Sequence, residues 1–459
     1  MVKKIIIIGA GITGLSLAKE LSDKNQIPVI LIEKENYIGG LAASLTKEGF
    51  SFDLGSHRIH PDYPSKIFTY LTKTLGVELL KRPRNGALHI QGKFIRYPAN
   101  IFNFLKVMSF KKSSHLFVNY VLNLFKIYPK EVKTYEEAML KTVGPVIYSS
   151  LYRDFAKKLW GIDPSLITVE GMKRRNVTIN FKTLKKSLSG QNSYFFYPKT
   201  GIGEIAQKLE QAVLKNKVTI IKSTAVEKIF LNDKQEISKL LLKGTDNKIN
   251  EIEASMIVST VPIDSLYRMV FDKSSPEEMS WRSLLLVYLH LKEPLERSND
   301  TFYFPELTTP IGRVSNINKF SPFLNASIQG VFLTIEIPSN PGEELWEMDE
   351  SKLSDLCARE LVKTGIYRSM PTILKHFSIK LKKAYPLYSV GWEEKFNRIY
   401  GQLKSIKGLY TLGRRGLFLH SNIDHAILQG IELSSIISND QGSKLDNKIS
   451  EFRKFTARD

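Results

Sequence analysis

The chain opens with a short apolar run that is followed at once by a helical pattern. Residues 4–8 hold four consecutive isoleucines, and unbroken β-branched residues are typical of a parallel strand covered on both faces. A second apolar run, 28–32, comes after the helical segment. This strand–helix–strand order predicts the first unit of an α/β domain.

Later apolar runs are widely separated along the chain. Further strands are predicted at 218–229, 256–262 and 408–412, with helices at 204–213 and beyond 416. Two other stretches differ in character. Segment 101–156 carries aromatic residues at helical spacing among lysines, and segment 266–385 contains strand-like runs at 283–291 and 330–337 that favour an antiparallel sheet.

Composition sets limits on the class of protein. The 459 residues are 42% hydrophobic and 24% charged, which indicates a soluble chain with a large core. Cys357 is the only cysteine, so an intramolecular disulfide, a cysteine-built zinc site and an iron–sulfur cluster are excluded. This pattern fits a reducing cytoplasm. The sequence has no run of 18 apolar residues, so we expect no transmembrane helix.

The chain is strongly basic, with a net charge of +20. This charge favours polyanions, anionic lipid or phosphorylated substrates, but it does not choose among them. Because the lysines and arginines are scattered, a solvated surface is favoured over nucleic-acid binding. The aromatic and lysine-rich segment 101–156 leaves peripheral membrane contact as an alternative to an ordinary helical core.

A glycine-rich turn joins the first strand to the first helix. Gly9, Gly11 and Gly14 have the spacing that allows a tight turn, close approach of a pyrophosphate and close packing of helix on strand. The helix that starts near Thr13 offers amide donors and a favourable dipole to phosphate. Glu33, at the end of the second strand, follows Gly14 by 19 residues and can accept hydrogen bonds from a ribose. The pattern predicts a dinucleotide site.

The residues after Glu33 narrow the choice of dinucleotide. Glu33 and Lys34 are followed by Gly39, Gly40 and Leu41, and later by Phe52-Asp53-Leu54-Gly55. This arrangement resembles the extended FAD fingerprint of the superfamily of amine oxidases, protoporphyrinogen oxidases and UDP-galactopyranose mutases. The resemblance implies FAD as the cofactor. A glycine pair also lets the backbone pass close to a planar ring system.

A second match lies near the end of the chain. Gly413-Arg414-Arg415-Gly416, followed by a helix with Asp424 and Gly430, resembles the C-terminal flavin segment of that superfamily. The resemblance places Arg414 beside the isoalloxazine, whereas Asp424 either caps the helix amides or contacts the cofactor. The cofactor-binding residues that the whole resemblance implies are Gly9, Gly11, Thr13, Gly14, Glu33, Lys34, Gly39, Gly40, Leu41, His57, Val226, Gly413, Arg414 and Asp424.

The resemblance also implies a fold class and a discontinuous organisation. The expected fold is α/β, a Rossmann-type FAD-binding domain with inserted helical and antiparallel β-sheet substrate domains. The expected segments are an FAD-binding part at 1–80, a mainly helical insertion at 81–195, FAD-binding parts at 196–265 and 386–438, an antiparallel sheet at 266–385 and a polar tail at 439–459. We expect the tail to be loosely held.

Three motifs resemble the UDP-galactopyranose mutase branch in particular. They are His57-Arg58-Ile59-His60, Lys158-Leu159-Trp160-Gly161-Ile162-Asp163-Pro164 and Arg174-Arg175. The resemblance implies that both arginines meet a substrate diphosphate, while Trp160 either stacks on a base or fills the core. The two histidines alone do not predict a metal site, and packing near the flavin is favoured for them. Phe418 and His420 stand among the substrate-contacting positions where the mutases carry tyrosines.

Three hypotheses about function follow. The first is an FAD-dependent oxidoreductase with flavin N5 as hydride acceptor, in which the flavin carries the chemistry and Arg414 and His60 are candidate catalytic side chains. The second is a mutase that acts on a nucleotide sugar through reduced FAD. The third is a non-catalytic flavin-binding partner at the membrane surface. The expected ligand is a small molecule, and the expected location is cytoplasmic, with peripheral attachment to the inner face of the membrane as the alternative.

Overall fold

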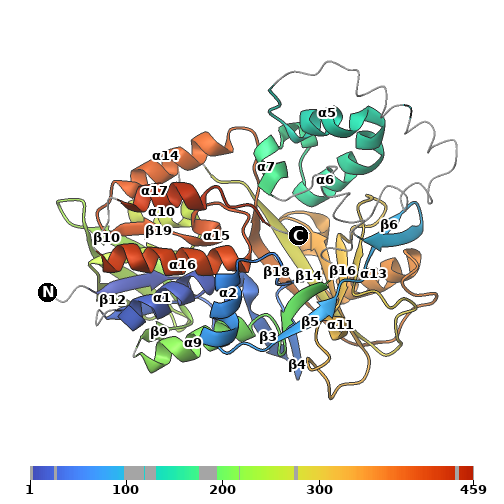
Figure 1. The fold of residues 1–459 in the computed structure, drawn as a ribbon, viewed down its shortest axis with the longest axis horizontal. Helices are drawn as coiled ribbons and strands as arrows, with labels where there is room; N and C mark the ends of the chain where they lie inside the picture. Colours follow the sequence, from blue (N-terminus) through green and yellow to red (C-terminus); the bar gives the residue numbers. More distant parts are fainter. Residues whose placement is uncertain are drawn as a thin grey trace. The chain divides into compact units, whose positions relative to one another are not determined.

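A computed structural model describes residues 4–24, 28–97, 118, 131–174, 194–216, 218–272, 278–439 and 444–457. The chain forms two compact units, each built from separate pieces of sequence (Figure 1). Unit 1 comprises residues 1–79, 198–280 and 391–459, and unit 2 comprises residues 80–197 and 281–390. The finer division into six segments stays a prediction.

A five-stranded parallel sheet forms the centre of unit 1. Its strands, in spatial order, are β19 (Leu409–Thr411), β13 (Met256–Ser259), β1 (Ile5–Ile8), β2 (Val29–Ile32) and β9 (Thr219–Ile221). All four residues of β1 are buried, as expected for an isoleucine run at the centre of a parallel sheet. The strand–helix–strand prediction and the α/β fold class are confirmed.

Helices and smaller sheets complete unit 1. The helices are α1 (Ile12–Lys24), η1 (Gly40–Ala42), α2 (Ser65–Thr69), η2 (Tyr70–Thr74), α9 (Glu204–Lys215), α10 (Ile263–Phe271), α14 (Trp392–Lys404), α15 (Gly413–Gly416), α16 (Ile423–Ser438) and α17 (Leu445–Phe452). The remaining strands form a hairpin, β3 (Ser44–Lys47) and β4 (Phe50–Asp53), and an antiparallel sheet, β10 (Thr224–Leu231), β11 (Ile237–Gly244) and β12 (Ile249–Glu253).

Two glycines bring α1 close to its neighbours in unit 1. A Cβ at Gly14 would stand 2.1 Å from the carbonyl oxygen of Gly9, and one at Gly430 would stand 2.7 Å from the backbone nitrogen of Leu17. Only glycine therefore allows α1 to sit this near to β1 on one side and to α16 on the other. The third glycine of the motif is thus explained by helix–strand packing, as the sequence predicts.

A seven-stranded sheet forms the centre of unit 2. Its spatial order is β18 (Ile373–Pro386), β14 (Trp281–Leu291), β17 (Val331–Pro338), β16 (Arg313–Asn316), β15 (Thr301–Tyr303), β6 (Gly86–Ile90) and β7 (Lys93–Tyr97). All neighbouring pairs are antiparallel except β15 and β6. The predicted strands at 283–291 and 330–337 are both present.

The remaining elements of unit 2 are mostly helical. They are β5 (Leu79–Pro83), which pairs with β8 (Tyr194–Pro198), then α5 (Tyr135–Ile147), η3 (Tyr148–Tyr152), α6 (Arg153–Trp160), η4 (Pro164–Leu166), α7 (Val169–Arg174), α11 (Ile317–Phe320), α12 (Glu344–Glu347) and α13 (Glu350–Lys363). Segment 135–160 is helical, as predicted, whereas most of 101–134 lies outside the described residues.

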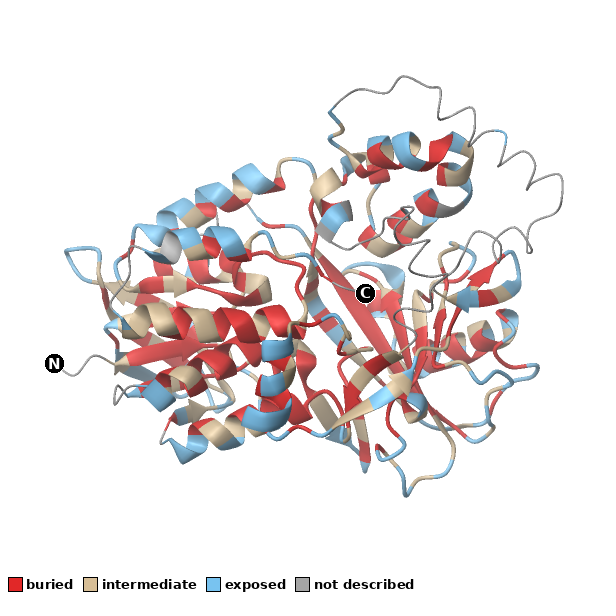
Figure 2. Cartoon of the chain, in the orientation of Figure 1, coloured by how far each residue is buried: buried red, intermediate tan, exposed pale blue. Residues whose placement is uncertain are grey.

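The seven-stranded sheet has two chemically different faces. Alternate residues of β14 and β17, such as Val287, Leu289 and Ile335, pack with Leu353 and Cys357 of α13 in one hydrophobic cluster. The central strands β1 and β14 are buried over almost their whole length (Figure 2). Val287 and Leu289 are core residues, with 0% and 1% exposure. The opposite face mixes polar side chains, such as Thr334, with apolar ones, such as Leu286.

The sequence did not predict a hairpin formed by β6 and β7, whose turn residues, Gln91 and Gly92, both have positive φ. One local expectation was wrong. The tail is not loosely held. Ile449 and Phe452 are buried, with 3% and 1% exposure, and Arg453 donates to Glu393 at 3.3 Å. The apolar residues of α17 recur at helical spacing, and this explains why the tail packs on unit 1.

Candidate functional site

The glycine turn lies between β1 and α1. Gly9 has a φ of +102°, and a Cβ there would stand 2.3 Å from the Thr260 hydroxyl oxygen, so this glycine is required by the turn itself. Gly11 is different, because a Cβ at this position meets no neighbouring heavy atom of the described chain within 4 Å. The fold therefore leaves open space beside Gly11, at the start of a helix whose first amides have no partner within the helix.

Glu33 is held in a fixed orientation at the end of β2. Its carboxylate accepts hydrogen bonds from the backbone amides of Ala10, at 2.8 Å, and Glu35, at 3.1 Å. The side chain is 8% exposed. The acidic group thus sits directly beside the glycine turn, in the arrangement that suits the hydroxyls of a ribose.

The second glycine pair packs on the first turn. The Gly39 amide donates to Ala10 O at 2.8 Å, and a Cβ at Gly40 would lie 3.3 Å from the Cα of Gly11. Gly39 has a φ of +96°, and a Cβ on it would also touch Ala206 at 3.0 Å. Close backbone packing therefore accounts for this pair without a ring system beside it, and a flavin contact stays a prediction.

The C-terminal turn reaches the same place from the other end of the chain. Gly413 has a φ of +81°, and a Cβ there would lie 3.4 Å from the Thr13 hydroxyl oxygen. Its amide donates to Gln429 Oε1 at 2.7 Å, while Gln429 Nε2, fully buried, has no hydrogen-bond partner among the described residues. A donor of this kind is expected to meet a ligand acceptor.

Arg415 links the C-terminal turn to the acidic end of β2. Its guanidinium is half-buried, and burial lowers the pKa of Arg415 against the opposing charges of Tyr37, Glu33 and Glu35. Burial, and then the carboxylates of Glu35 and Glu33, raise the pKa of Tyr37 to about 12. The sequence resemblance pointed to Arg414 and not to Arg415, whose charge balances the carboxylates nearest the glycine turn.

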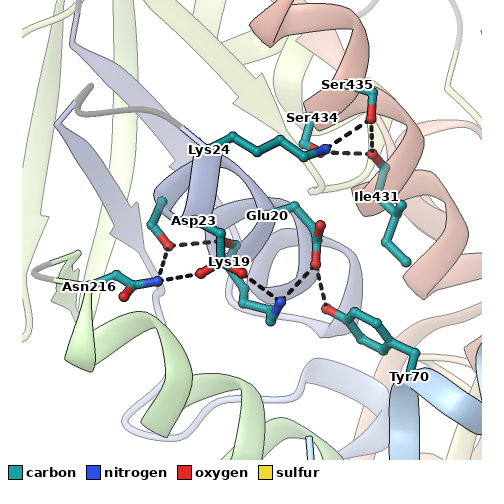
Figure 3. A network of polar contacts seen from close by, with 10 residues as sticks. Lys19, Glu20, Asp23, Lys24, Tyr70, Asn216, Ile431, Ser434 and Ser435 are labelled. Carbon is teal, nitrogen blue, oxygen red and sulfur yellow. Dashed lines mark hydrogen bonds and ion pairs between the residues drawn. The ribbon is translucent and has the colours of Figure 1, made fainter. Parts of the chain in front are cut away.

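Polar contacts fix the helix that presents the turn (Figure 3). Lys19 of α1 bonds to Glu20 at 2.9 Å and to Asp23 at 2.7 Å, and Tyr70 donates to the same Glu20 at 3.2 Å. Asn216, after α9, donates to Asp23 at 2.5 Å. These contacts tie α1 to η2 and to α9, so the start of the helix is held in one position.

A further contact of the same network reaches α16. Lys24, the last residue of α1, donates to Ser434 Oγ at 3.2 Å and to Ser435 Oγ at 3.0 Å (Figure 3). Both serine hydroxyls donate in turn to the Ile431 carbonyl oxygen. The helices that carry the two flavin-type motifs are therefore bound together at this end as well as through Gly430.

The remaining C-terminal candidates lie around the loop after α15. Arg414 donates to the Ser421 carbonyl at 3.2 Å and lies 3.4 Å from His420 Nδ1. Asp424 is fully buried in the first turn of α16, next to the N-cap residue Asn422. Phe418 has no exposed surface and packs on Trp392, with ring centroids 5.6 Å apart. Core packing accounts for Phe418 without a substrate.

The other predicted residues of unit 1 make mainly local contacts. His57 Nε2 lies 3.1 Å from the Leu54 carbonyl oxygen, and His60 Nδ1 accepts from the amide of Asp62 at 3.1 Å. Lys34 is exposed and pairs with Glu35 at 3.2 Å. Val226 is buried in β10 and Leu41 is half-buried in η1. Cofactor contacts of these residues stay predictions.

In unit 2, the Lys-x-Trp-Gly motif ends α6. Trp160 is 1% exposed, and Gly161 caps the helix with a φ of +74° over the Arg282 guanidinium. Lys158 donates to the carbonyl oxygens of Phe304, at 2.8 Å, and Ile311, at 3.0 Å. Burial lowers the pKa of Lys158 to about 8. The motif thus braces the interior of unit 2.

Some predictions fall outside what the structure describes. Arg174 is the last residue of α7, its side chain is not described, and Arg175 lies beyond the described residues. Most of the aromatic segment proposed for membrane contact lies there too. Within the described residues, no helix is long and apolar enough to cross a membrane. The same residues contain no group of three or more His, Cys, Asp or Glu placed to hold a metal ion.

Similar solved structures support the fold. The chain superposes on a reduced UDP-galactopyranose mutase with a TM-score of 0.82 and 20% identity, covering 98% of this chain and 99% of that one. A putative protoporphyrinogen oxidase from Exiguobacterium sp. 255-15 gives a TM-score of 0.75 and 16% identity, covering 96% and 100%. The expected Rossmann-type architecture with an inserted, mainly antiparallel sheet is therefore confirmed.

A family model defines the class. Residues 12–386 match the model for flavin containing amine oxidoreductases, so the chain belongs to this family. The cofactor is therefore FAD, as the fingerprint predicts. The open space at Gly11, the oriented Glu33 carboxylate and the buried Gln429 amide form a donor and acceptor set that fits this dinucleotide.

Curated relatives have diverse activities. A dTDP-fucopyranose mutase from Escherichia coli is 24% identical over 208 residues, which is 43% of this chain and 50% of that protein. A 4,4'-diaponeurosporene oxygenase from Staphylococcus haemolyticus is 28% identical over 250 residues, 48% of each chain. The chain spans about half the length of these relatives.

Proposed function

We propose that the protein is an FAD-dependent oxidoreductase that takes a hydride from a C–H bond of a small-molecule substrate. The observation that carries this proposal is the open space beside Gly11, in a turn whose other two motif glycines, Gly9 and Gly14, are tightly packed. An oxidoreductase family that matches most of the chain supports the same reaction class.

The residues of the chain hold and orient the cofactor. When bound, FAD supplies either a hydride acceptor at N5 or, in its reduced form, a nucleophile. The first amides of α1 and the helix dipole would hold the pyrophosphate, and Glu33 would accept from the ribose hydroxyls. Gly413 would let the C-terminal backbone approach the cofactor, and Gln429 Nε2 would donate a hydrogen bond to one of its acceptors. Arg414 is positioned by Ser421 and His420.

A second candidate is a mutase that acts on a nucleotide sugar. It is favoured by the sequence similarity to dTDP-fucopyranose mutase and to a probable UDP-galactopyranose mutase from Klebsiella pneumoniae, 23% identical over 186 residues. Phe418 does not count against it, because a side chain with no exposed surface is not a substitute for a tyrosine that contacts substrate.

One experiment tests both reactions. The purified protein is expected to show visible flavin absorbance, and FAD is expected in the supernatant after heat denaturation. UDP-galactopyranose is then added anaerobically to the oxidised and to the dithionite-reduced protein. Bleaching of the oxidised flavin by a substrate, with recovery in air, supports the oxidoreductase. Furanose formation by the reduced protein alone, with unchanged flavin bands, supports the mutase and overturns the oxidoreductase.

A further inference from the structure

Arg415 of the C-terminal turn faces the acidic end of β2, and both segments belong to unit 1. The turn begins at Gly413, where a Cβ would lie 3.4 Å from the Thr13 hydroxyl oxygen, so α15 lies beside the start of α1. Two of the opposing charges that act on the Arg415 guanidinium are the carboxylates of Glu33 and Glu35. A cation from the end of the chain therefore reaches the carboxylate that lies beside the glycine turn.

The segment after β2 holds these carboxylates in place. The Glu33 carboxylate accepts from the Ala10 amide at 2.8 Å, and the Gly39 amide donates to the Ala10 carbonyl oxygen at 2.8 Å. Between these two points, the Ser223 amide donates to the Glu35 carbonyl oxygen at 2.9 Å. The segment is thus fixed to the glycine turn at both ends, and the two carboxylates cannot leave it without breaking backbone hydrogen bonds.

The charges at this end of the candidate site need a cation. Glu33 and Glu35 bring two negative charges close to the space beside Gly11, and a pyrophosphate would add two more. Like charges oppose one another, and salt screens them poorly where they are partly buried. Lys34 pairs with Glu35 at 3.2 Å, but its side chain is 66% exposed, so water weakens its effect. Arg415 supplies a full positive charge from the half-buried side.

The two adjacent arginines of the turn have different surroundings. Arg414 donates to the Ser421 carbonyl oxygen at 3.2 Å and lies 3.4 Å from His420 Nδ1, so it serves the loop after α15. Arg415 instead acts on Tyr37, which lies in the segment after β2. Their positions differ by one residue, yet one side chain lies toward the C-terminal loop and the other toward the ribose carboxylate.

We propose that Arg415 is a positioning residue for the adenosine half of FAD. Its guanidinium offsets the charges of Glu33 and Glu35, so the Glu33 carboxylate stays ionised and available to the ribose hydroxyls when a pyrophosphate is held beside it. Arg415 acts through these carboxylates and does not need to touch the cofactor. This inference rests on FAD as the cofactor, as the proposed function does, and it holds for hydride transfer and for the mutase reaction alike.

The test measures the affinity of the full-length apoprotein for FAD and for ADP, which carries the adenosine and pyrophosphate groups alone. Fluorescence titration measures FAD, and calorimetry measures ADP. Arg415→Gln is expected to weaken both ligands about tenfold, because two uncompensated carboxylates then repel the phosphates. Arg415→Lys keeps the charge and is expected to bind both ligands within about threefold of the wild type.

A double variant tests whether Arg415 acts through the carboxylates. When Glu35→Gln is added to Arg415→Gln, one negative charge is removed together with the cation. Most of the lost affinity for FAD and ADP should then return. An arginine that merely stabilised the fold would not show this recovery, since the double variant has lost two side chains of the cluster. The melting temperature of each apoprotein is recorded beside its affinities.

Lys222→Gln is the matched control in unit 1. Lys222 pairs with Glu210 at 2.7 Å and directly precedes Ser223, which contacts the segment after β2. The substitution makes the same change in net charge close to the same segment, but it removes a cation that faces α9. Its affinities for FAD and ADP are expected to equal those of the wild type.

Three outcomes overturn the inference while the wild type binds FAD. Arg415→Gln could weaken FAD and leave ADP unchanged, which would assign Arg415 to the flavin half. The Gln and Lys variants could lose equal affinity, which would show that the charge is not what matters. The wild type could fail to bind ADP, so that no adenosine site exists before the flavin binds. Failure of the wild type to bind FAD would instead overturn the proposed function itself.

Discussion

The glycine turn of unit 1 and a row of buried hydroxyls across the unit 2 sheet, Thr301, Ser315 and Thr334, are built in opposite ways. In the turn, the side chain is missing, and Gly11 leaves open space for a ligand next to backbone amides. In the row, side chains such as Thr334 fill the surface and bring polar atoms that the described protein does not satisfy.

The difference shows which structural features can be recognised from the sequence alone. A turn is local, so its glycines must occur at fixed spacing, and the motif can be recognised without knowing the fold. The row is set by strand register between residues far apart in sequence, such as Ser315 and Thr334. A surface of this second kind becomes visible only when the sheet is assembled.

The largest effect is expected from Gly14→Val, which disrupts the packing of the glycine turn in unit 1. The Cβ would stand 2.1 Å from Gly9 O and 3.3 Å from the Ile7 side chain, so α1 must move off β1. We expect a loss of about 4 kcal/mol or more in the free energy of unfolding. Urea unfolding measures it, and a loss below about 1 kcal/mol would contradict the packing argument.

The next prediction concerns Lys158, a buried side chain of unit 2 whose ammonium group donates hydrogen bonds to backbone carbonyl oxygens. Burial lowers the pKa of Lys158 from its ordinary value of 10.5 to about 8, so the unfolded chain binds more protons between these pH values. The free energy of unfolding therefore rises with pH in this window, by up to about 3 kcal/mol. Below pH 8 this contribution is constant.

The measurement is the difference between wild type and Lys158→Met in urea unfolding from pH 7.5 to 10.5. Only the wild type should gain stability from deprotonation of this group, since a neutral amine still donates to the two carbonyl oxygens of Phe304 and Ile311. Replacement of the exposed Lys173 by Met serves as the control. A constant difference across the window would show that Lys158 is not buried in this way.

Gly11→Ala tests whether the space beside Gly11 serves a ligand or the packing of the protein itself. Because the added Cβ meets no neighbouring atom of the described chain, the FAD-free protein should unfold within about 0.5 kcal/mol of the wild type. Affinity for FAD is expected to fall about a hundredfold, or about 2.7 kcal/mol, since the methyl group enters the pyrophosphate space. Fluorescence titration of the apoprotein with FAD measures this affinity. An unchanged affinity would show that the pyrophosphate does not bind beside Gly11.

The smallest effect is expected from Glu336→Gln, on the second side of the comparison. The change keeps a hydrogen-bond acceptor but leaves the partly buried Arg313 charge uncompensated, so we expect a loss of about 2 kcal/mol in unfolding free energy. Flavin content should be unchanged. Thermal unfolding followed by circular dichroism measures the loss, and a change in flavin retention would mean that the two surfaces are not independent.

The sequence predicted the cofactor unit well because its evidence is local. The isoleucine strand, the glycine turn and Glu33 all lie where the pattern placed them. The β6–β7 hairpin was not predicted from the sequence, because its turn uses Gln91 rather than the usual Asn or Asp before Gly92. The Gln429 amide left one signal, a single polar residue within an apolar run, but its contact with Gly413 depends on the tertiary fold.

Other features could not be predicted for physical reasons. Arg415 balances Glu33 and Glu35 across hundreds of residues, and sequence similarity favoured its neighbour Arg414. The tail looked polar because Ile449 and Phe452 are spaced among charges, and only the helix aligns them on one face. From the sequence, Trp160 could either stack on a base or fill the core. Its burial places it in the interior of unit 2.

The discontinuous sheet of unit 1 also orders events during synthesis. A ribosome completes β1 and β2 early, yet the edge strand β19, which pairs with β13, and the helix α16 are made only after both pieces of unit 2 have been translated. Until then, one side of β13 has no neighbouring strand, and the turn at Gly413 does not exist. The C-terminal part of the candidate cofactor site is therefore complete only after residue 438 has been translated, and until then the nascent chain carries an unfinished sheet edge.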